Sequence, residues 1–126
     1  MKILLDTHIL VWFAEGIDKL PNLTKLVIEN LDNQRYVSII SLWEIVIKAS
    51  LKKSEFKHTL KEINLFLVSN DINLLSIDVK HLDILSTLPF YHKDPFDRLL
   101  IAQAIAENLT LISVDQHFQA YAVNLL

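Results

Sequence analysis

Short apolar runs of strand length alternate with helical patterns along almost the whole sequence. This alternation is typical of a parallel sheet, because each crossover helix joins two parallel strands and covers one face of the sheet. We expect strands at residues 2–5, 36–39, 73–77 and 109–113, and an edge strand at 123–125. Helical spacing of apolar residues occurs over 9–15, 23–31, 42–51, 59–68, 79–87, 96–106 and 116–121. The sequence therefore predicts one α/β domain over residues 1–126, with helices on both faces of the sheet.

The content of glycine and cysteine excludes several classes of enzyme. Glycine occurs once, at Gly16, where an average chain of this length carries about nine. Phosphate-binding P-loops, dinucleotide-binding fingerprints and nucleophile elbows each need two or more glycines. There are no cysteines, which excludes disulfides, zinc–thiolate sites and cysteine nucleophiles. Any chemistry must therefore use neither a glycine-rich phosphate loop nor a thiol.

Charge and hydropathy bear on partners and location. The formal net charge is -3, so binding to nucleic acid must depend on local patches or bound metal rather than on overall charge. The hydrophobic fraction of 52% and the mean hydropathy of +0.32 favour an oligomer or a tight partner; the alternative is a well-filled core. No run approaches the roughly 20 apolar residues of a membrane span, and Asp6 comes too early for a signal peptide. We expect a soluble, cytoplasmic protein.

Four acidic residues lie near the ends of predicted strands. Asp6 directly follows the first strand, and Asp115 follows the fourth. Glu44 is early in the helix after the second strand, and Asp97 is early in the helix before the fourth. Ligands of open parallel sheets bind beyond the carboxyl ends of the strands, near the point where the strand order reverses. The four acids could therefore meet at one edge of the sheet.

Each acid also has an explanation as a residue that starts a helix. Ser41 and Glu44 have the spacing of a capping box. Asp94 could cap a helix whose first residue is Pro95. Three acids of the set could likewise occupy a cap or a first helical turn: Asp6, Asp97 and Asp115. Taken one at a time, the acids favour this structural interpretation.

Taken together, the acids favour a metal site. Two carboxylates about 4 Å apart repel each other by about 1 kcal/mol in water, and by about 4 kcal/mol at an effective dielectric constant of 20. A divalent cation offsets this repulsion, and Mg²⁺ prefers oxygen ligands. Without the metal, at least one of the carboxylates should have a raised pKa. Such a site is suited to phosphodiester hydrolysis by metal-activated water, with one or two ions and no side-chain nucleophile.

Four segments resemble the PIN-domain nucleases, and among them the VapC-like toxins of type II toxin–antitoxin systems. They are LLDTH at residues 4–8, SIISLWEI at 38–45, HKDPFDRLLIAQA at 92–104 and LISVDQHF at 111–118. The third segment is the most specific, and the resemblance spans nearly the whole chain. It implies a three-layer α/β/α sandwich with a central, mainly parallel sheet. It also implies an endoribonuclease that depends on Mg²⁺ or Mn²⁺, forms a homodimer and is inhibited by a cognate antitoxin.

The resemblance assigns roles residue by residue. It implies catalytic and metal-binding roles for the four acids, which are Asp6, Glu44, Asp97 and Asp115. Thr7 and Ser113 match small hydroxyl residues that support the site. Asp94 matches an extra acid, which either caps a helix or helps to hold the metal, and we favour the cap.

Basic residues and histidines have less specific interpretations. Lys48, Lys52, Lys53, Lys57 and Lys61 could contact RNA phosphates or could form a solvated helix face. Arg98 could bind substrate phosphate or pair with an acid, and we favour the ion pair. The histidines lack the close spacing of metal ligands, so we expect surface or loop positions for all of them: His8, His58, His81, His92 and His117.

Two further functional hypotheses stay open. One is a Mg²⁺-dependent phosphatase or phosphotransferase, which needs a second acid two residues after the nucleophilic aspartate. Asp6 is followed by Thr7 and His8, which argues against this chemistry. The other is a module that binds RNA or a protein partner without catalysis.

Overall fold

The computed structural model describes residues 1–16, 18–52 and 58–126. In this part of the chain, four strands form one parallel sheet in the order β3-β2-β1-β4. The strands are β1 (Lys2–Leu5), β2 (Gln34–Ser38), β3 (Asn73–Leu75) and β4 (Thr110–Ile112). The predicted parallel sheet is therefore confirmed, and the short strands make the sheet narrow along the strand direction.

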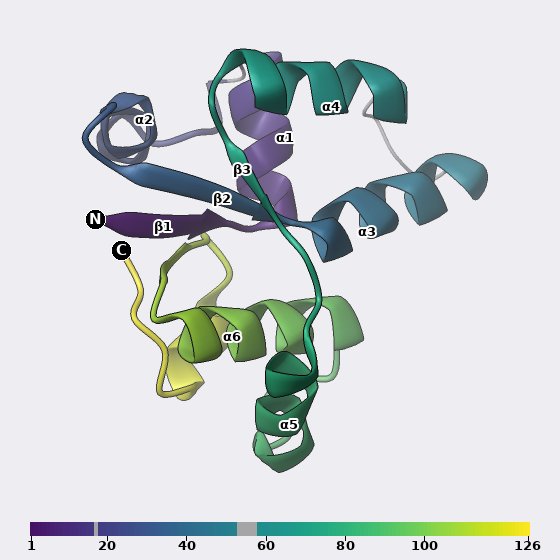
Figure 1. Cartoon of the computed structure of the whole chain (residues 1–126), viewed down its shortest axis with the longest axis vertical. Helices are drawn as coiled ribbons and strands as arrows, with labels where there is room; N and C mark the ends of the chain where they lie inside the picture. The colour runs from purple at the N-terminus through teal and green to yellow at the C-terminus, as the bar shows by residue number, and fades with distance from the viewer. Residues whose placement is uncertain (17, 53–57) are drawn as a thin grey trace.

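Six α-helices and one 3₁₀ helix of the described residues connect and cover these strands (Figure 1). They are α1 (Thr7–Glu15), α2 (Asn22–Glu29), α3 (Ile39–Ser50), α4 (Leu60–Ser69), α5 (Val79–Thr87), α6 (Pro95–Glu107) and the 3₁₀ helix η1 (Gln116–Ala120). In Figure 1, α1, α2 and α4 lie on one side of β1 and β2, and α5 and α6 lie on the other. This arrangement is the predicted α/β/α sandwich.

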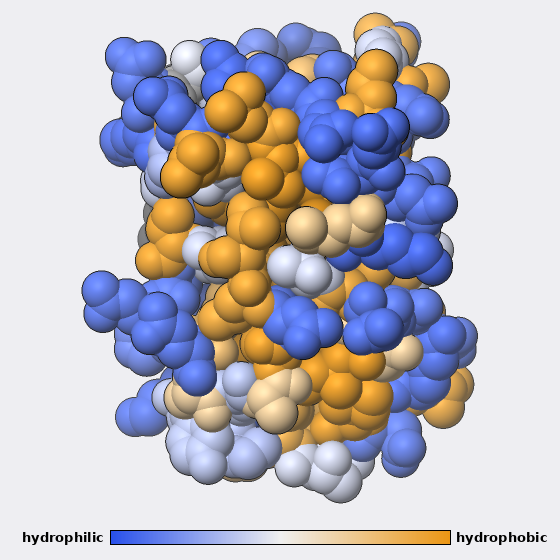
Figure 2. Space-filling view, turned by 90° about the vertical axis from the view of Figure 1, so that its left-hand side faces the viewer, coloured by the Kyte–Doolittle hydropathy of each residue, from blue (hydrophilic) through white to orange (hydrophobic). Residues whose placement is uncertain are grey.

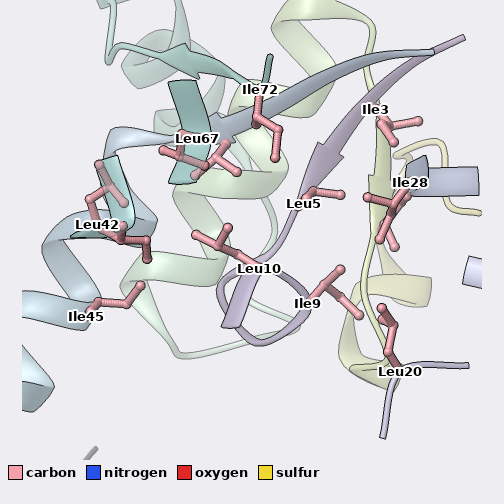
Figure 3. Close-up of a cluster of buried hydrophobic side chains, with 13 residues drawn as sticks. Ile3, Leu5, Ile9, Leu10, Leu20, Ile28, Leu42, Ile45, Leu67 and Ile72 are labelled. Carbon is pink, nitrogen blue, oxygen red and sulfur yellow. The ribbon is translucent and has the colours of Figure 1, made fainter. Parts of the chain in front are cut away.

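The alternation of side chains along β1 divides the interior into two cores. Ile3 and Leu5 belong to the core under α1 and α2, which Figure 3 shows. Leu4 points to the opposite face and packs in a second core with residues of α6 such as Leu100 and Ile101. All three β1 side chains are fully buried, because a central parallel strand is covered on both faces.

Two helices end where a residue adopts the left-handed backbone conformation. Gly16, with φ of 66°, follows α1, and its N–H donates to the carbonyl groups of Trp12 and Phe13. Asn108, with φ of 53°, ends α6 in the same way. Glycine and asparagine adopt this conformation at the lowest cost, which explains the position of the chain's one glycine.

Most predicted elements agree with the structure within a few residues, and three details differ. Helix α3 begins at Ile39, so Ser38 is its N-cap and accepts from the Ile40 N–H. The predicted capping box of Ser41 and Glu44 is therefore wrong, because both residues lie inside the helix. Residues 116–120 form a 3₁₀ helix, and the predicted edge strand at 123–125 is a single bridge between Leu111 and Leu125.

The apolar excess of the sequence is only partly buried. Large apolar side chains are more than half exposed at several positions of the described chain, among them Leu23, Leu26, Leu31 and Trp43. Figure 2 shows a band of apolar side chains on the face that carries α2 and the two chain ends. No helix of the described residues has the length and apolar character that crossing a membrane requires.

Candidate active site

The candidate site lies at the carboxyl edge of the sheet, beside its central strand. Strand β2, the next strand after β1 in the sequence, pairs with one edge of β1, and β4, the last strand, pairs with the other edge. The strand order therefore reverses at β1, and this is where open parallel sheets bind ligands. Asp6 follows β1, helix α3 follows β2, and the segment with Ser113 and Asp115 follows β4.

Asp6 is buried at the start of α1. It is 4% exposed, and its Oδ1 accepts a 2.8 Å hydrogen bond from the Ile9 N–H as the helix N-cap. Burial raises the pKa of Asp6, and the charge of Glu44 raises it further. The pKa is lowered by hydrogen bonds from Ser113 and Ile9 and by the nearby His8. The net result is a pKa above the usual value, because burial disfavours the charged form.

Glu44 is 5% exposed and projects from the second turn of α3. Its Oε1 lies 2.8 Å from Thr7 Oγ1, which is also 3.0 Å from Ser41 Oγ. Its Oε2 pairs with Lys48 Nζ at 2.8 Å. Thr7 therefore connects the start of α1 to α3, and Lys48, which we considered for RNA phosphates, is here the counter-ion of a buried carboxylate.

Asp97 lies in the first turn of α6. Its Oδ2 is 2.8 Å from His92 Nε2. Burial and the neighbouring Asp94 raise the pKa of Asp97 to about 6, His92 lowers it, and Glu44 adds a further increase. The expected carboxylate of raised pKa is thus present. Asp94 accepts from the N–H groups of Phe96 and Asp97 at 2.8 and 3.2 Å, so it occupies the cap position that we favoured.

Asp115 is the most exposed of the four acids, with its side chain 33% exposed. Its Oδ1 accepts from the His117 N–H at 2.9 Å and contacts His117 Nδ1 at 2.8 Å, and its Oδ2 lies 3.4 Å from His92 Nε2. Burial alone raises the pKa of Asp115, but the interactions with His117 and His92 outweigh it and lower the pKa below its usual value. The Asp115 N–H donates to Ser113 Oγ at 3.0 Å.

These contacts bring the four predicted acids into one electrostatic cluster. The charge of Glu44 acts on both Asp6 and Asp97, and His92 joins Asp97 to Asp115. Asp6 and Asp115 do cap their helices, as the structural interpretation predicted, but capping alone does not require the acids to converge. Thr7 and Ser113 hold the cluster together as hydrogen-bonding partners of Glu44, Asp6 and Asp115.

The structure gives two histidines contacts that sequence reasoning missed. His92 and His117 stack at the edge of the cluster, with ring centroids 4.7 Å apart and an angle of 22° between the planes. Both have the loop or surface position that we expected, but their contacts with the acids were not predicted. Each lies two residues from an acid of the third or fourth segment that resembles the family, His92 from Asp94 and His117 from Asp115. This spacing could have indicated that the two histidines lie near the site. The expectation of a loop or surface position was wrong for His81, which is buried in α5.

Arg98 contacts backbone carbonyl groups rather than an acid. Its guanidinium is buried, with 6% of the residue exposed, and donates to the carbonyl groups of Pro89 at 2.8 Å and Leu88 at 3.3 Å. It also lies 4.0 Å above the Phe90 ring. The favoured ion pair with an acid is absent from the described residues, and Arg98 instead fixes the loop before α6.

The remaining lysines are less informative. Lys52 is exposed and has a φ of 55° just beyond the end of α3, so the helix does not continue through it. Lys61 is exposed on α4. Lys53 and Lys57 lie outside the described residues.

Comparisons with known proteins agree with this architecture. The family model described as PIN domain matches residues 3–124. VapBC2 from Rickettsia felis, solved bound to a fragment of promoter DNA, is 23% identical with a TM-score of 0.73, over 100% of this chain and 98% of that chain. VapBC-1 from nontypeable Haemophilus influenzae is 17% identical with a TM-score of 0.73, over 100% and 97% of the two chains. FitAcB from Neisseria gonorrhoeae is 21% identical with a TM-score of 0.64, over 98% and 96%. No curated protein sequence matches the chain.

Proposed function

Because this chain belongs to the PIN domain family, we propose that it is an endoribonuclease that depends on Mg²⁺ or Mn²⁺ and acts as the toxin of a toxin–antitoxin pair. One observation carries the proposal. Carboxylates from four separate segments converge at the point where the strand order reverses. The chain keeps these acids together although burial and mutual repulsion raise the pKa of two of them.

The donor set fits a hard divalent cation. Asp6, Glu44, Asp97 and Asp115 offer oxygen ligands, which Mg²⁺ and Mn²⁺ prefer. The four carboxylates lie near one lysine, Lys48, and two histidines, His92 and His117, and repulsion by Glu44 still acts on Asp6 and Asp97. A divalent ion would remove the remaining repulsion, so these four residues are the proposed ligands.

The side chains around the acids would act mainly by positioning. A bound divalent ion supplies a Lewis acid that activates water and offsets charge on the reacting phosphate. Thr7 and Ser113 fix the orientation of the carboxylates through their hydroxyl groups. Asp94 stabilises the first turn of α6 and so holds the Asp97 backbone in place. Lys48, Lys52 and Arg98 stay the proposed contacts for RNA phosphates, although in this structure Lys48 pairs with Glu44 and Arg98 is bound to loop carbonyls.

The proposed antitoxin partner is supported by an apolar groove. A cavity of about 550 Å³ between α3 and α4 is lined by Ile39, Leu42, Trp43, Val46 and Leu60. Such a groove suits the apolar face of a helical segment. The similar structures include VapBC2 and VapBC-1 and a toxin–antitoxin complex from Klebsiella pneumoniae. The exposed apolar residues elsewhere support the proposed homodimer. The cytoplasmic location is proposed because the proposed substrate is RNA.

The direct test is cleavage of a defined, end-labelled RNA by the purified chain. We expect cleavage with Mn²⁺ or Mg²⁺, none with EDTA, and a loss of about 100-fold or more in Asp6→Asn. Asparagine can still cap α1, so circular dichroism should show a folded variant. Asp32→Asn, in the exposed turn before β2, is the matched control and should cleave normally.

Two results would contradict the proposal. Cleavage that persists in EDTA or in Asp6→Asn would exclude metal-dependent hydrolysis at this site. RNA binding that survives EDTA, without cleavage under any condition, would replace the enzyme by a non-catalytic binding module.

A further inference from the structure

One group of potential metal ligands at the site differs in chemistry from the four acids. His92, Asp115 and His117 each place one ligand atom within 4.8 Å of the others. Two of the three donors are imidazole nitrogens, which Mg²⁺ rarely takes and which Zn²⁺, Co²⁺ and Ni²⁺ favour. The donor set therefore indicates a different class of ion from the carboxylate set.

The positions of the rings already resemble a binding geometry. His117 Nδ1 lies 2.8 Å from Asp115 Oδ1, and His92 Nε2 lies 3.4 Å from Asp115 Oδ2. Tetrahedral zinc sites have ligand bonds of about 2.0–2.1 Å, which places neighbouring donor atoms about 3.4 Å apart. The ligand atoms therefore need to move by about 1 Å to share an ion.

The two histidine side chains differ in their exposure. The His92 side chain is 14% exposed. The backbone N–H of His92 donates to the Tyr121 hydroxyl at 2.9 Å, and its ring centroid lies 6.1 Å from that of Phe118. His117 is 65% exposed at its side chain, so its ring can turn at the cost of its stack on His92. A fixed ligand and a mobile one can close on an ion with little change in the backbone.

The proton on His92 must move for Nε2 to bind a metal. The Asp94 N–H lies 3.5 Å from His92 Nδ1, a separation at the outer limit of a hydrogen bond. Placing the proton on Nδ1 therefore gives up the 2.8 Å contact of Nε2 with Asp97 Oδ2 as well as the weak interaction at Nδ1. In return, the Nε2 lone pair becomes available for the ion.

We infer that His92, Asp115 and His117 form a site for a divalent transition metal such as Zn²⁺, with a fourth position open to water or to a phosphate oxygen. Three protein ligands and one open position are the pattern of zinc sites that also bind a further ligand. This inference goes beyond the proposed function, because it holds whether or not the chain cleaves RNA. Asp115 belongs to both ligand sets, so the two kinds of ion would compete for it or share it.

The test uses the whole chain and Co²⁺ as a spectroscopic probe, with Zn²⁺ affinity measured by calorimetry. We expect the strong visible absorption of tetrahedral Co²⁺, which Zn²⁺ should displace at a far lower concentration than Mg²⁺ does. His92→Ala and His117→Ala should each weaken Zn²⁺ binding by about tenfold or more. His58→Ala, at an exposed histidine before α4, is the control and should bind Zn²⁺ as the parent does.

Two outcomes would overturn the inference. One is Zn²⁺ affinity unchanged in folded His92→Ala and His117→Ala, which would leave the histidines as hydrogen-bonding partners of the acids. The other is a weak, octahedral Co²⁺ spectrum. Glu44→Gln separates this inference from the proposed function, because it should abolish RNA cleavage while changing Zn²⁺ affinity by no more than about threefold.

Discussion

Two regions of this molecule place ionisable groups in the interior, and they treat charge in opposite ways. Between α5 and α6, the buried His81 contacts Glu107 at 2.9 Å, and Lys80 contacts the same carboxylate oxygen at 2.8 Å. At the carboxyl edge of the sheet, Glu44 lies close enough to repel both Asp6 and Asp97. The first region pairs opposite charges, whereas the second gathers like charges.

The pKa values record the same difference. Lys80 and His81 lower the pKa of Glu107, so its charged form is favoured in the folded state. Burial and Asp94 raise the pKa of Asp97 to about 6, so its charged form is disfavoured. The region between α5 and α6 is complete as it stands. The carboxyl edge gathers negative charge that a divalent cation would offset, and this contrast is the physical basis of the proposed function.

The largest expected effect separates the regions by activity. Asp97→Asn should lower RNA cleavage by about 100-fold or more, because it removes a proposed metal ligand. Glu107→Gln should leave cleavage unchanged, although it too removes a carboxylate from α6. Single-turnover cleavage rates measure both. Equal rates for the two variants would remove the functional distinction between the regions.

The second effect is on stability when metal is added. Saturating Mn²⁺, at about 100 times its Kd, should stabilise the fold at pH 8 by about 2.7 kcal/mol. This gain should shrink at pH 5, because Asp97, with a pKa of about 6, then holds a proton that competes with the ion. Thermal unfolding with and without Mn²⁺ at both pH values measures the difference. A gain of equal size at both would argue against a carboxylate site.

The third effect appears in the metal-free protein. Folded Asp97 keeps its proton up to about pH 6, whereas its usual pKa is 3.8. Between about pH 4 and pH 6, the folded state therefore binds more protons than the unfolded state does. As pH rises through this range, the contribution of Asp97 to the free energy of unfolding falls. Asp97→Asn lacks this loss and should be more stable than the parent by about 1–3 kcal/mol at pH 8.

Denaturant unfolding in EDTA across pH measures this difference. The gap between Asp97→Asn and the parent should widen as pH rises from about 4 to about 6. A gap that stays constant over this range would mean that the raised pKa of Asp97 does not destabilise the folded state.

The smallest effect concerns the region between α5 and α6. Glu107→Gln should lower the free energy of unfolding by about 1 kcal/mol, because the carboxylate is partly exposed and its ion pairs are screened by solvent. The sign is opposite to that expected for Asp97→Asn. Stabilisation by Glu107→Gln would break the comparison, since it would show that both regions are strained.

Sequence patterns predicted the sheet and most helices because the apolar periodicity of each segment is strong. The convergence of Asp6, Glu44, Asp97 and Asp115 followed from the rule that parallel strands present their carboxyl ends at one edge. The start of α3 was misjudged because Ser38 and Ser41 are both acceptable caps. The helix begins after the earlier serine, Ser38, and Ile40 in its first turn is buried in the second core.

The environment of particular side chains could not be predicted in the same way. Arg98 stands next to Asp97 in sequence, but neighbouring residues in a helix point about 100° apart, so it reaches the loop at Leu88 and Pro89 instead. His92 and His117 are 25 positions apart in the sequence, and only the packing of η1 against the start of α6 brings their rings together. Contacts of this kind depend on tertiary structure rather than on a local pattern.

The account rests on a divalent ion held by carboxylates at the reversal point of the sheet. Anomalous diffraction from crystals grown with Mn²⁺ tests this directly. We predict an anomalous peak about 2.1–2.2 Å from carboxylate oxygens of at least two of Asp6, Glu44, Asp97 and Asp115, and no peak there in Asp97→Asn. An ordered site with no anomalous density between these side chains, at saturating Mn²⁺ and pH 8, would contradict the account.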